Sequence, residues 1–378
     1  MNIAIDAINV RSDGGKTHLL EIIKYFELSN SSNKKVFLFC DTDIKKLAKK
    51  FNNIETIDLP QITNFWLFGI IWQTFFLSKL VKKKDCSVLF NLNGTYIGNF
   101  KNVVTITQNL LPFNLHEASK YGFSFKFFKF FFYKIAHIAC LNKSKGIIFL
   151  SNYQKQLLSK YIYKNKLTKK NCLIPHAGKI FKYNKEPKDI KNYNISNPFV
   201  IGYVSSIEPY KNHIKILDYL YEIKKKGYPI KYLIVGKKGH SSTVANLVNK
   251  INELDPKKKW IEWRKNVDYE IMSEVYSRLD MMIFGSTCES FGIPVAEAIQ
   301  TGIPTLCADK ECLRSSFNEK VLYFNPLNKF EALETIENII LSKNIRKIQR
   351  RDYVKTYNQW NWEKVSKETF HFLEKFNN

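Results

Sequence analysis

Short apolar runs alternate with longer stretches of helical periodicity along most of the chain. The runs are rich in β-branched and aromatic residues, and the segments between them are long enough to hold a helix. In the first half they lie at residues 3–5, 36–39, 87–90, 103–106 and 146–150, and in the second half at residues 199–204, 232–235, 281–284 and 303–306. Strands joined by helical crossovers form parallel sheets, so the pattern predicts an α/β fold with two Rossmann-like, doubly wound domains.

A polar stretch over residues 181–197 separates the two halves, and its Lys, Asn and Pro content predicts an interdomain linker. We therefore expect an N-terminal domain over residues 1–180 and a C-terminal domain over 198–358. The remaining residues, 359–378, carry an amphipathic pattern that predicts a helix crossing back onto the N-terminal domain. Ligands of such sheets bind beyond the carboxyl ends of the strands, so we expect a cleft that the two domains face.

The chain is strongly basic, with 59 Lys and Arg against 34 Asp and Glu and a formal net charge of +25. Such a charge favours a polyanionic partner or surface. A basic nucleic-acid-binding protein is the alternative from another functional class, but the chain has no recognisable helix-turn-helix, zinc or RNA-binding motif, and we expect no nucleic-acid partner. The seven cysteines form no C-x-x-C pair, and the N-terminus is typical of a strand, which predicts a cytoplasmic protein.

The segment from Glu289 to Glu297 follows an apolar run and carries two carboxylates around a Gly-Pro helix start. Gly292 allows a ligand to approach the backbone, Pro294 suits the first helical position, and the free N–H groups there attract an anion. Carboxylates accept hydrogen bonds from sugar hydroxyls. The pattern predicts a sugar and phosphate site, and the alternative is an ordinary capped helix with acids in its first turn.

Two other segments fit a phosphate or sugar ligand. Asp13-Gly-Gly-Lys16 follows the first run and precedes a helical pattern, where backbone amides can approach a phosphate. Lys211 follows the run at residues 199–204, where a cation can hold a diphosphate. Each also has a plain interpretation, a strand-to-helix turn for the glycine pair and a solvated lysine for Lys211.

Taken together, Gly14-Gly15, Glu208-Pro-Tyr-Lys-Asn212 and the Glu289–Glu297 segment resemble the motifs of retaining glycosyltransferase family 4, whose members have the GT-B fold. The resemblance extends to residues 146–154, 172–178, 277–280 and 360–363, and so covers nearly the whole chain. The variant Thr107-Gln-Asn-Leu-Leu-Pro-Phe113 resembles members that build O-antigen, lipopolysaccharide and other bacterial surface polysaccharides.

This resemblance implies a hexosyltransferase of the EC 2.4 class that transfers a sugar from a GDP- or UDP-linked donor to a lipid-linked or growing glycan. Mannose is the first choice of sugar, and UDP-linked glucose, galactose or N-acetylhexosamine are the alternatives. The family generally works without a metal, and no metal-ligand spacing such as H-E-x-x-H occurs, so we expect no cofactor and no bound metal.

The resemblance also implies roles for individual residues. Glu297 would bind the ribose, Glu289 would lie near the sugar hydroxyls, and Lys211 would stabilise the departing diphosphate, which makes Lys211 and Glu289 the catalytic candidates. The expected donor-binding residues are Gly14, Gly15, Lys211, Glu289, Phe291, Gly292, Ile293 and Glu297.

Two departures from the family pattern matter. Many members carry a second diphosphate-binding Arg just after the strand that Ser205 and Ser206 end here, so phosphate neutralisation would rest on Lys211 and backbone amides. Many members also have a His-Asp pair where this chain has Gln108-Asn109. Gln108, Asn109 and Glu117 are the acceptor-side candidates, while a plainer interpretation makes Asn109 a turn residue and Glu117 a solvated helix residue.

The stretch over residues 121–134 combines phenylalanines with lysines at helical spacing. Lys126, Lys129 and Lys134 share one arc, and Phe128, Phe131 and Ile135 lie largely opposite, together with Phe127. Such a helix suits an anionic membrane surface. The alternative is a domain helix whose phenylalanines face the core. The family resemblance favours the first, so we expect peripheral attachment to the inner face of the cytoplasmic membrane.

Overall fold

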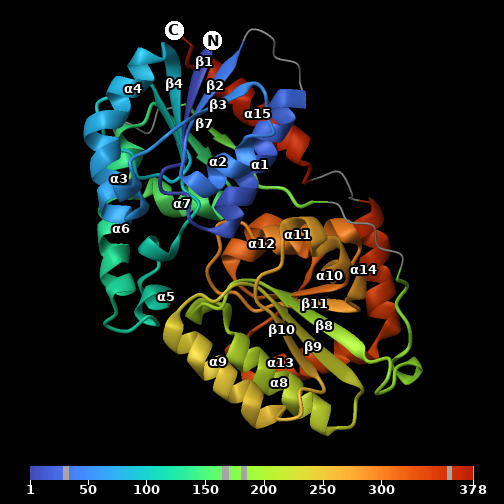
Figure 1. Ribbon diagram of the computed structural model, residues 1–378. Helices are drawn as coiled ribbons and strands as arrows, with labels where there is room; N and C mark the ends of the chain where they lie inside the picture. Colours follow the sequence, from blue (N-terminus) through green and yellow to red (C-terminus); the bar gives the residue numbers. More distant parts are fainter. Residues whose placement is uncertain (29–33, 164–169, 180–184, 356–359, 378) are drawn as a thin grey trace. The chain divides into compact units, whose positions relative to one another are not determined.

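The computed structural model of the chain describes residues 1–28, 34–163, 170–179, 185–355 and 360–377. These residues form two compact units (Figure 1). Unit 1 comprises Met1–Ala118, Phe123–His176 and Asn361–Asn378, and unit 2 comprises Ser119–Gly122 and Ala177–Trp360. The predicted linker over residues 181–197 lies partly outside the described residues, and its described part, 185–197, belongs to unit 2.

Within its described residues, unit 1 holds a seven-stranded sheet in the order β3-β2-β1-β4-β5-β6-β7, and all its pairings are parallel. The order reverses between β1 and β4, which makes that position the topological switch point. The strands are β1 (Asn2–Asp6), β2 (Lys35–Phe39), β3 (Ile54–Ile57), β4 (Cys86–Asn91), β5 (Val103–Ile106), β6 (Gly146–Phe149) and β7 (Lys170–Leu173).

Helices cover the faces of this sheet (Figure 1). Leu19, Ile22, Ile23 and Phe26 follow helical spacing on α1 and are all buried, which explains how that helix packs. The helices are α1 (Asp13–Leu28), α2 (Thr42–Ala48), α3 (Trp66–Trp72), α4 (Ser78–Lys83), α5 (Leu115–Ser119), α6 (Phe125–Lys143), α7 (Asn152–Ser159) and α15 (Trp362–Glu374), with a π-helical turn η2 (Gln73–Leu77) and short 3₁₀ turns η1 (Gln61–Asn64) and η3 (Leu111–Phe113).

The last helix, α15, belongs to unit 1 although the chain before it belongs to unit 2. The Asn361 side chain caps it by accepting a hydrogen bond from the Glu363 amide at 2.7 Å. Its inner face packs on α1, where the Ser366 hydroxyl donates to the Ile22 carbonyl at 2.7 Å and the Phe370 ring lies 4.3 Å from the Phe26 ring. The predicted return of the C-terminal helix to the N-terminal domain is therefore confirmed.

Unit 2 holds a second parallel sheet, with six strands among its described residues in the order β10-β9-β8-β11-β12-β13. Its switch point lies between β8 and β11. The strands are β8 (Phe199–Val204), β9 (Ile230–Val235), β10 (Ile261–Arg264), β11 (Met281–Phe284), β12 (Thr305–Ala308) and β13 (Leu322–Phe324). The buried carboxylate of Asp280 anchors β8 by accepting hydrogen bonds from the Val200 amide at 2.8 Å and the Tyr193 hydroxyl at 2.7 Å.

The helices of unit 2 alternate with its strands along the chain, so both predicted Rossmann-like domains are confirmed. They are α8 (His213–Lys225), α9 (Ser241–Leu254), α10 (Met272–Arg278), α11 (Ile293–Thr301), α12 (Glu311–Phe317), α13 (Lys329–Leu341) and α14 (Lys343–Lys355), with 3₁₀ turns η5 (Ile190–Asn192), η6 (Pro209–Lys211), η7 (Tyr269–Ile271) and η8 (Asn318–Lys320).

The apolar runs located nine strands, and the four that they missed, β3, β7, β10 and β13, are the edge strands of the two sheets. An interior strand of a parallel sheet is buried on both faces, as every residue of β5 and β11 is, and it is therefore mainly apolar. An edge strand is only partly covered. The sequence of β7, Lys-Asn-Cys-Leu, accordingly has no fully buried position.

None of the helices in the described residues is both long enough and apolar enough to cross a lipid bilayer.

Candidate functional site

The loops that follow β8 and β11 lie at the switch point of unit 2 and are joined by hydrogen bonds. Asn212 has a left-handed backbone, with φ of 56°, and its side-chain amide donates to the Gly285 carbonyl at 2.8 Å. The Thr287 amide donates to the Tyr210 carbonyl at 2.9 Å. These bonds hold the loop that carries Lys211 beside the loop that carries Glu289.

Lys211 is buried, with 7% of its surface exposed, and its ammonium group forms an ion pair with Glu289 Oε1. The same ammonium lies 5.0 Å from the ring centres of both Tyr210 and Phe284. A buried charge needs a partner, and here the carboxylate of Glu289 and the two aromatic rings supply it. The interpretation of Lys211 as a solvated lysine is therefore wrong.

The loop after β11 enters α11 through Gly292, whose φ of 105° is a conformation that side chains disfavour. A Cβ at this position would also lie 3.3 Å from the Leu313 and Phe317 side chains. Gly292 is the N-cap residue and no side chain caps this helix end. No acidic residue lies in the first turn, so that part of the alternative interpretation is wrong. Pro294 occupies the first turn, as predicted.

Phe291 and Ile293 flank that glycine. The Phe291 side chain is 1% exposed and packs against Phe317 with a ring separation of 5.2 Å. Its aromatic group therefore belongs to the core, and only its backbone can reach a ligand. This arrangement is compatible with the backbone role that the family resemblance implies for residues 291–293.

Glu297 lies in the second turn of α11. Its side chain is buried, and its Oε2 accepts a hydrogen bond from the Tyr276 hydroxyl at 2.7 Å. Gly178 contacts the same turn so closely that a Cβ there would lie 2.5 Å from the Glu297 amide nitrogen. The carboxylate is thus fixed in direction by Tyr276 on α10. Unit 2 brings Lys211, Glu289, Gly292 and Glu297 together around the carboxyl ends of β8 and β11.

The glycine pair of unit 1 differs from the expectation. Gly14 and Gly15 lie in the first turn of α1, which begins at Asp13, so they do not form a loop before the helix. The Gly15 amide donates to the Ser12 hydroxyl at 3.1 Å. A Cβ at Gly15 would lie 3.0 Å from that hydroxyl and 3.1 Å from Val10 Cγ1. Close packing within unit 1 is thus sufficient to explain the need for glycine at this position.

The acceptor-side candidates are also in unit 1. Gln108 donates to the Leu92 carbonyl at 3.1 Å, and its Nε2 lies 3.2 Å from His18 Nδ1. Asn109 accepts a hydrogen bond from the Leu111 amide at 3.0 Å, as a turn residue does. Glu117 is 3% exposed, and its carboxylate lies 3.3 Å from His116 Nδ1, so its interpretation as a solvated residue is wrong.

Gln108 lies beside the glycine pair, because its Oε1 is 3.5 Å from the position that a Gly15 Cβ would take. The structure therefore places the predicted site residues in two groups. Gly14, Gly15, Gln108, Asn109 and Glu117 belong to unit 1, and the remaining ones belong to unit 2.

The family model described as glycosyl transferases group 1 matches residues 185–358, which lie entirely in unit 2. This part of unit 2 is therefore similar to glycosyl transferases group 1 domains. The serotype-specific mannosyltransferase WbdA of Escherichia coli is 31% identical over 122 residues, which make up 32% of this chain and 15% of WbdA. This chain therefore spans only a small part of the length of that relative.

Solved structures extend the likeness to both units. The Anabaena protein HepE, crystallised with UDP and glucose, superposes with a TM-score of 0.69 at 16% identity, covering 99% of this chain and 100% of HepE. Sucrose-phosphate synthase from Thermosynechococcus elongatus gives a TM-score of 0.74 at 14% identity, covering 99% of this chain and 98% of that one. At such low identities the likeness shows the fold, which is GT-B.

Two features of unit 2 were missed by sequence reasoning. Tyr276 fixes Glu297 but precedes it by 21 residues, and no local pattern connects them. Lys237 and Lys238 follow β9 after Gly236, and the Ile207 amide donates to the Lys237 carbonyl at 3.1 Å, which places these lysines beside the loop after β8. A glycine and two lysines after an apolar run were the available signal for that turn.

The described residues form no metal-binding cluster at this site, and the pocket described below lies elsewhere, in unit 1. Among the described residues, no group of three or more His, Cys, Asp or Glu side chains is placed to hold a metal ion. The absence of a metal requirement stays a prediction.

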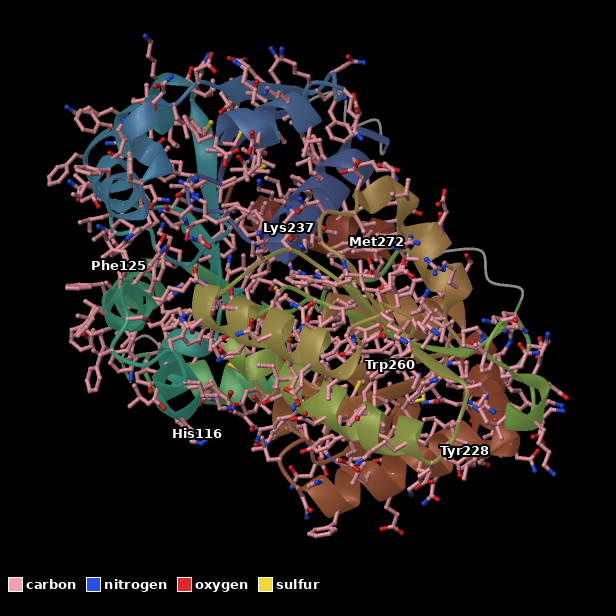
Figure 2. All side chains as sticks on the ribbon, turned by 60° about the horizontal axis from the view of Figure 1, so that its bottom comes forward. His116, Phe125, Tyr228, Lys237, Trp260 and Met272 are labelled. Carbon is pink, nitrogen blue, oxygen red and sulfur yellow. The ribbon has the colours of Figure 1, made fainter. Side chains whose placement is uncertain are left out.

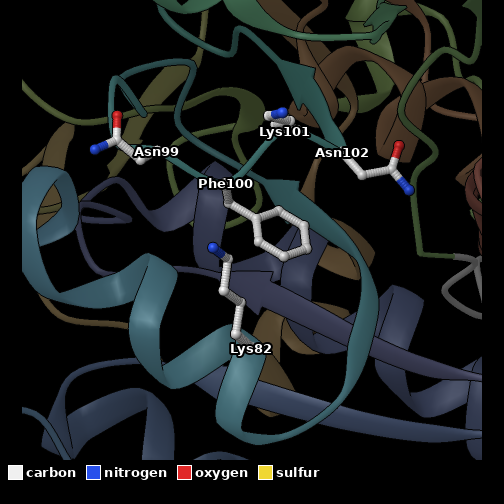
Figure 3. A pocket seen from close by; sticks show the side chains of 5 residues that line it. All are labelled: Lys82, Asn99, Phe100, Lys101 and Asn102. Carbon is white, nitrogen blue, oxygen red and sulfur yellow. The ribbon is translucent and has the colours of Figure 1, made fainter.

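A pocket of ≈ 360 Å³ in unit 1 is lined by Lys82, Phe100 and Asn102, and Figure 3 shows Lys82 extending from α4 toward the Phe100 ring. It adjoins the amino end of β5, the edge opposite the predicted site.

The aromatic face of α6 points to solvent rather than to the core. Phe128, Phe131 and Ile135 are each more than half exposed, whereas Tyr133 and His137 on the other side are buried. The alternative in which the phenylalanines of this helix fill the core is therefore wrong.

Four histidines are buried and uncharged. Burial lowers the pKa of His18 to about 3, of His137 to about 4 and of His213 to about 3. His176, whose ring lies 4.4 Å from that of His18, has its pKa lowered well below the usual value by burial and then by His18. Because each ring takes up a proton near pH 6.5 when the chain unfolds, the folded state loses stability as the pH falls below that value.

This titration gives a measurable prediction for His137, which shares a hydrogen bond of 2.8 Å with the Gly94 carbonyl. The lowered pKa of His137 adds to the free energy of unfolding above pH 6.5, and this contribution is lost as the pH falls toward 4. Each such histidine is expected to make the free energy of unfolding about 2 kcal/mol smaller at pH 5 than at pH 7. His137→Leu should therefore flatten the fall in urea midpoint between those values, and His371→Gln, which changes an exposed histidine, should not. An unchanged slope in His137→Leu would contradict the assignment.

Proposed function

We propose that this protein is a retaining glycosyltransferase that transfers a hexose from a nucleotide sugar to a lipid-linked or growing surface glycan. The observation that carries the proposal is the buried Lys211–Glu289 ion pair beside the amino end of α11, in the segment that matches the group 1 family model. A cation held in this way offers a fixed charge to a diphosphate leaving group.

In this proposal the donor lies across the switch point of unit 2. Lys211 and the amino end of α11 hold the diphosphate, because helix amino ends and ammonium groups attract anions. Glu289 positions Lys211 and accepts hydrogen bonds from the sugar hydroxyls. Glu297 accepts hydrogen bonds from the ribose, and Tyr276 keeps its carboxylate in the required direction.

Lys211 carries most of the charge neutralisation in this proposal. Where many family members have an Arg, this chain has Ser205 and Ser206, and the Ser205 hydroxyl lies 2.9 Å from His213 Nε2. His213 cannot replace the missing cation, because burial keeps its imidazole neutral near pH 7. No metal takes part in the proposed reaction. The departing phosphate assists deprotonation of the acceptor hydroxyl on the same face, so the anomeric configuration is retained.

A mannosyl donor linked to GDP is our first choice, and the similarity to WbdA, a mannosyltransferase, supports it. The HepE structure contains UDP and glucose, which supports the alternative of a UDP-linked sugar. The proposed acceptor, a lipid-linked or growing surface glycan, is based on the resemblance of the chain to proteins that build surface polysaccharides. A lipid-linked acceptor requires access to a membrane, and we propose that the protein is peripheral on the inner face of the cytoplasmic membrane.

A panel of nucleotide sugars tests the donor. GDP-mannose is expected to raise the melting temperature of the purified chain more than UDP-glucose, UDP-galactose or UDP-N-acetylglucosamine does, because a ligand that binds only the folded state stabilises it by mass action. A larger shift with one of the UDP-sugars would replace the first choice with that donor. No shift with any member of the panel at millimolar concentration would contradict the proposed donor site.

A further inference from the structure

Two helical segments of unit 1 lie side by side, and each exposes apolar side chains at the same helical spacing. The helical segment that runs through α3, η2 and α4 exposes Phe68, Ile71 and Phe75, which are 42–64% exposed. Helix α6 exposes Phe128, Phe131 and Ile135, which are 52–63% exposed. Both triplets follow the spacing i, i+3, i+7, which puts their members on one side of each helix.

Trp66 joins the two helices. Its ring lies 5.3 Å from that of Tyr133 and 6.5 Å from that of Phe132, and the Lys129 ammonium lies 5.2 Å from its centre. Figures 1 and 2 show both helices on the same outer edge of unit 1, with Phe125 marking the start of α6. The two exposed triplets thus belong to one continuous part of the unit 1 surface, which we call the two-helix face.

The charge of this face selects its partner. Residues 66–83 contain three lysines, Lys79, Lys82 and Lys83, and no acidic residue. Helix α6 contains four lysines and no acidic residue. A soluble protein rarely leaves so many large apolar groups exposed together, and bulky apolar side chains flanked only by lysines fit the boundary between acyl chains and anionic headgroups.

We infer that the two-helix face is the membrane-docking surface of this protein and that α3–α4 contributes to it as much as α6 does. The partner is a bilayer that contains anionic lipids. In this arrangement the apolar triplets enter the headgroup region, and exposed lysines of the same helices, such as Lys79, lie near the phosphates. The inference deepens the proposed function, since it rests on a glycosyltransferase that acts on a lipid-linked acceptor.

Vesicle co-sedimentation of the full chain tests the inference. Wild type is expected to bind phosphatidylcholine vesicles that contain phosphatidylglycerol, and to bind pure phosphatidylcholine vesicles much less. The pairs Phe68→Ser with Phe75→Ser and Phe128→Ser with Phe131→Ser should each weaken binding roughly tenfold or more, because each removes two phenylalanines from the buried area. Phe330→Ser, at a phenylalanine 84% exposed on α13 of unit 2, is the matched control and should bind as wild type does.

Three results would overturn the inference. Wild-type binding by the Phe68 and Phe75 pair would show that α6 docks alone. If both pairs bind vesicles as the wild type does, the two-helix face is not the membrane-docking surface. A wild-type dimer that both pairs dissociate, without any vesicle binding, would show that a second copy covers it. If a serine pair lowers the melting temperature by itself, Lys79→Glu with Lys126→Glu provides a second variant, which should weaken binding to the phosphatidylglycerol vesicles.

The thermal shift with nucleotide sugar, measured without vesicles, separates this inference from the proposed function. All the variants of the two-helix face should keep the wild-type shift, since none of these residues lies in unit 2. A missing shift in the wild type would contradict the donor site while leaving the vesicle result in place.

Discussion

Lys211→Ala is expected to lower nucleotide release from the donor by roughly 10²- to 10³-fold, the cost of removing one fixed charge or donor from a developing anion. The ammonium is buried, paired with Glu289 and surrounded by Tyr210 and Phe284, so water does not readily replace it. The loss should appear mainly in kcat, because the negative charge on the diphosphate grows as the bond to the sugar breaks.

Lys215→Ala is the matched control for this variant. Lys215 lies one turn further along the chain, on α8, and its side chain is exposed. It should therefore retain wild-type turnover in an assay that detects released GDP or UDP. A Lys211→Ala enzyme that is folded by circular dichroism and turns over at the wild-type rate would contradict the role given to Lys211.

Glu297→Ala should produce the second large effect, a loss of donor binding. A hydrogen bond between a carboxylate and a ribose hydroxyl is worth about 1.5–3 kcal/mol, so donor affinity should fall roughly 10- to 100-fold. Tyr276→Phe should cause a smaller loss, because it removes only the hydroxyl that directs the carboxylate. Titration calorimetry with the donor chosen by the thermal-shift panel measures both variants.

Glu274→Gln serves as the control, because Glu274 is an exposed residue of α10, the helix that carries Tyr276. Its affinity should match that of the wild type. Equal donor affinity in the wild type and Glu297→Ala would remove Glu297 from the site. A Tyr276→Phe enzyme that loses as much affinity as Glu297→Ala would show that the hydroxyl itself contacts the donor.

The interior of both sheets was predictable because an interior parallel strand is buried on both faces and is therefore mainly apolar. The runs at residues 199–204 and 281–284 coincide with β8 and β11, and these two strands fix where Lys211 and Glu289 lie. Edge strands such as β13 are short and only partly covered, so they leave no such run. The geometry of Glu297 was not predictable, since it depends on Tyr276, which only the packing of α10 on α11 brings near.

Local reasoning led to one error and left one question open. Gly14 and Gly15 suggested a loop because glycine disfavours helices, but both lie in the first turn of α1, where Gly15 packs closely against Ser12 and Val10. The periodicity of α6 showed that one side is aromatic but not which side meets the sheet. Burial of Tyr133 and His137 decided that question, because it turns Phe128 and Phe131 to solvent.

Transfer of labelled sugar is the most direct test of the account. The purified full chain, supplied with GDP-mannose labelled in the sugar and with a membrane extract containing lipid-linked glycans, should move the label into the lipid fraction and release GDP in equal amount. The new linkage should keep the α configuration of the donor, as read from the anomeric proton by NMR. Lys211→Ala should lower the transfer by roughly 10²- to 10³-fold, and Lys215→Ala should leave it unchanged. Label that stays on the nucleotide with every sugar of the panel, or equal transfer by wild type and Lys211→Ala, would contradict the account.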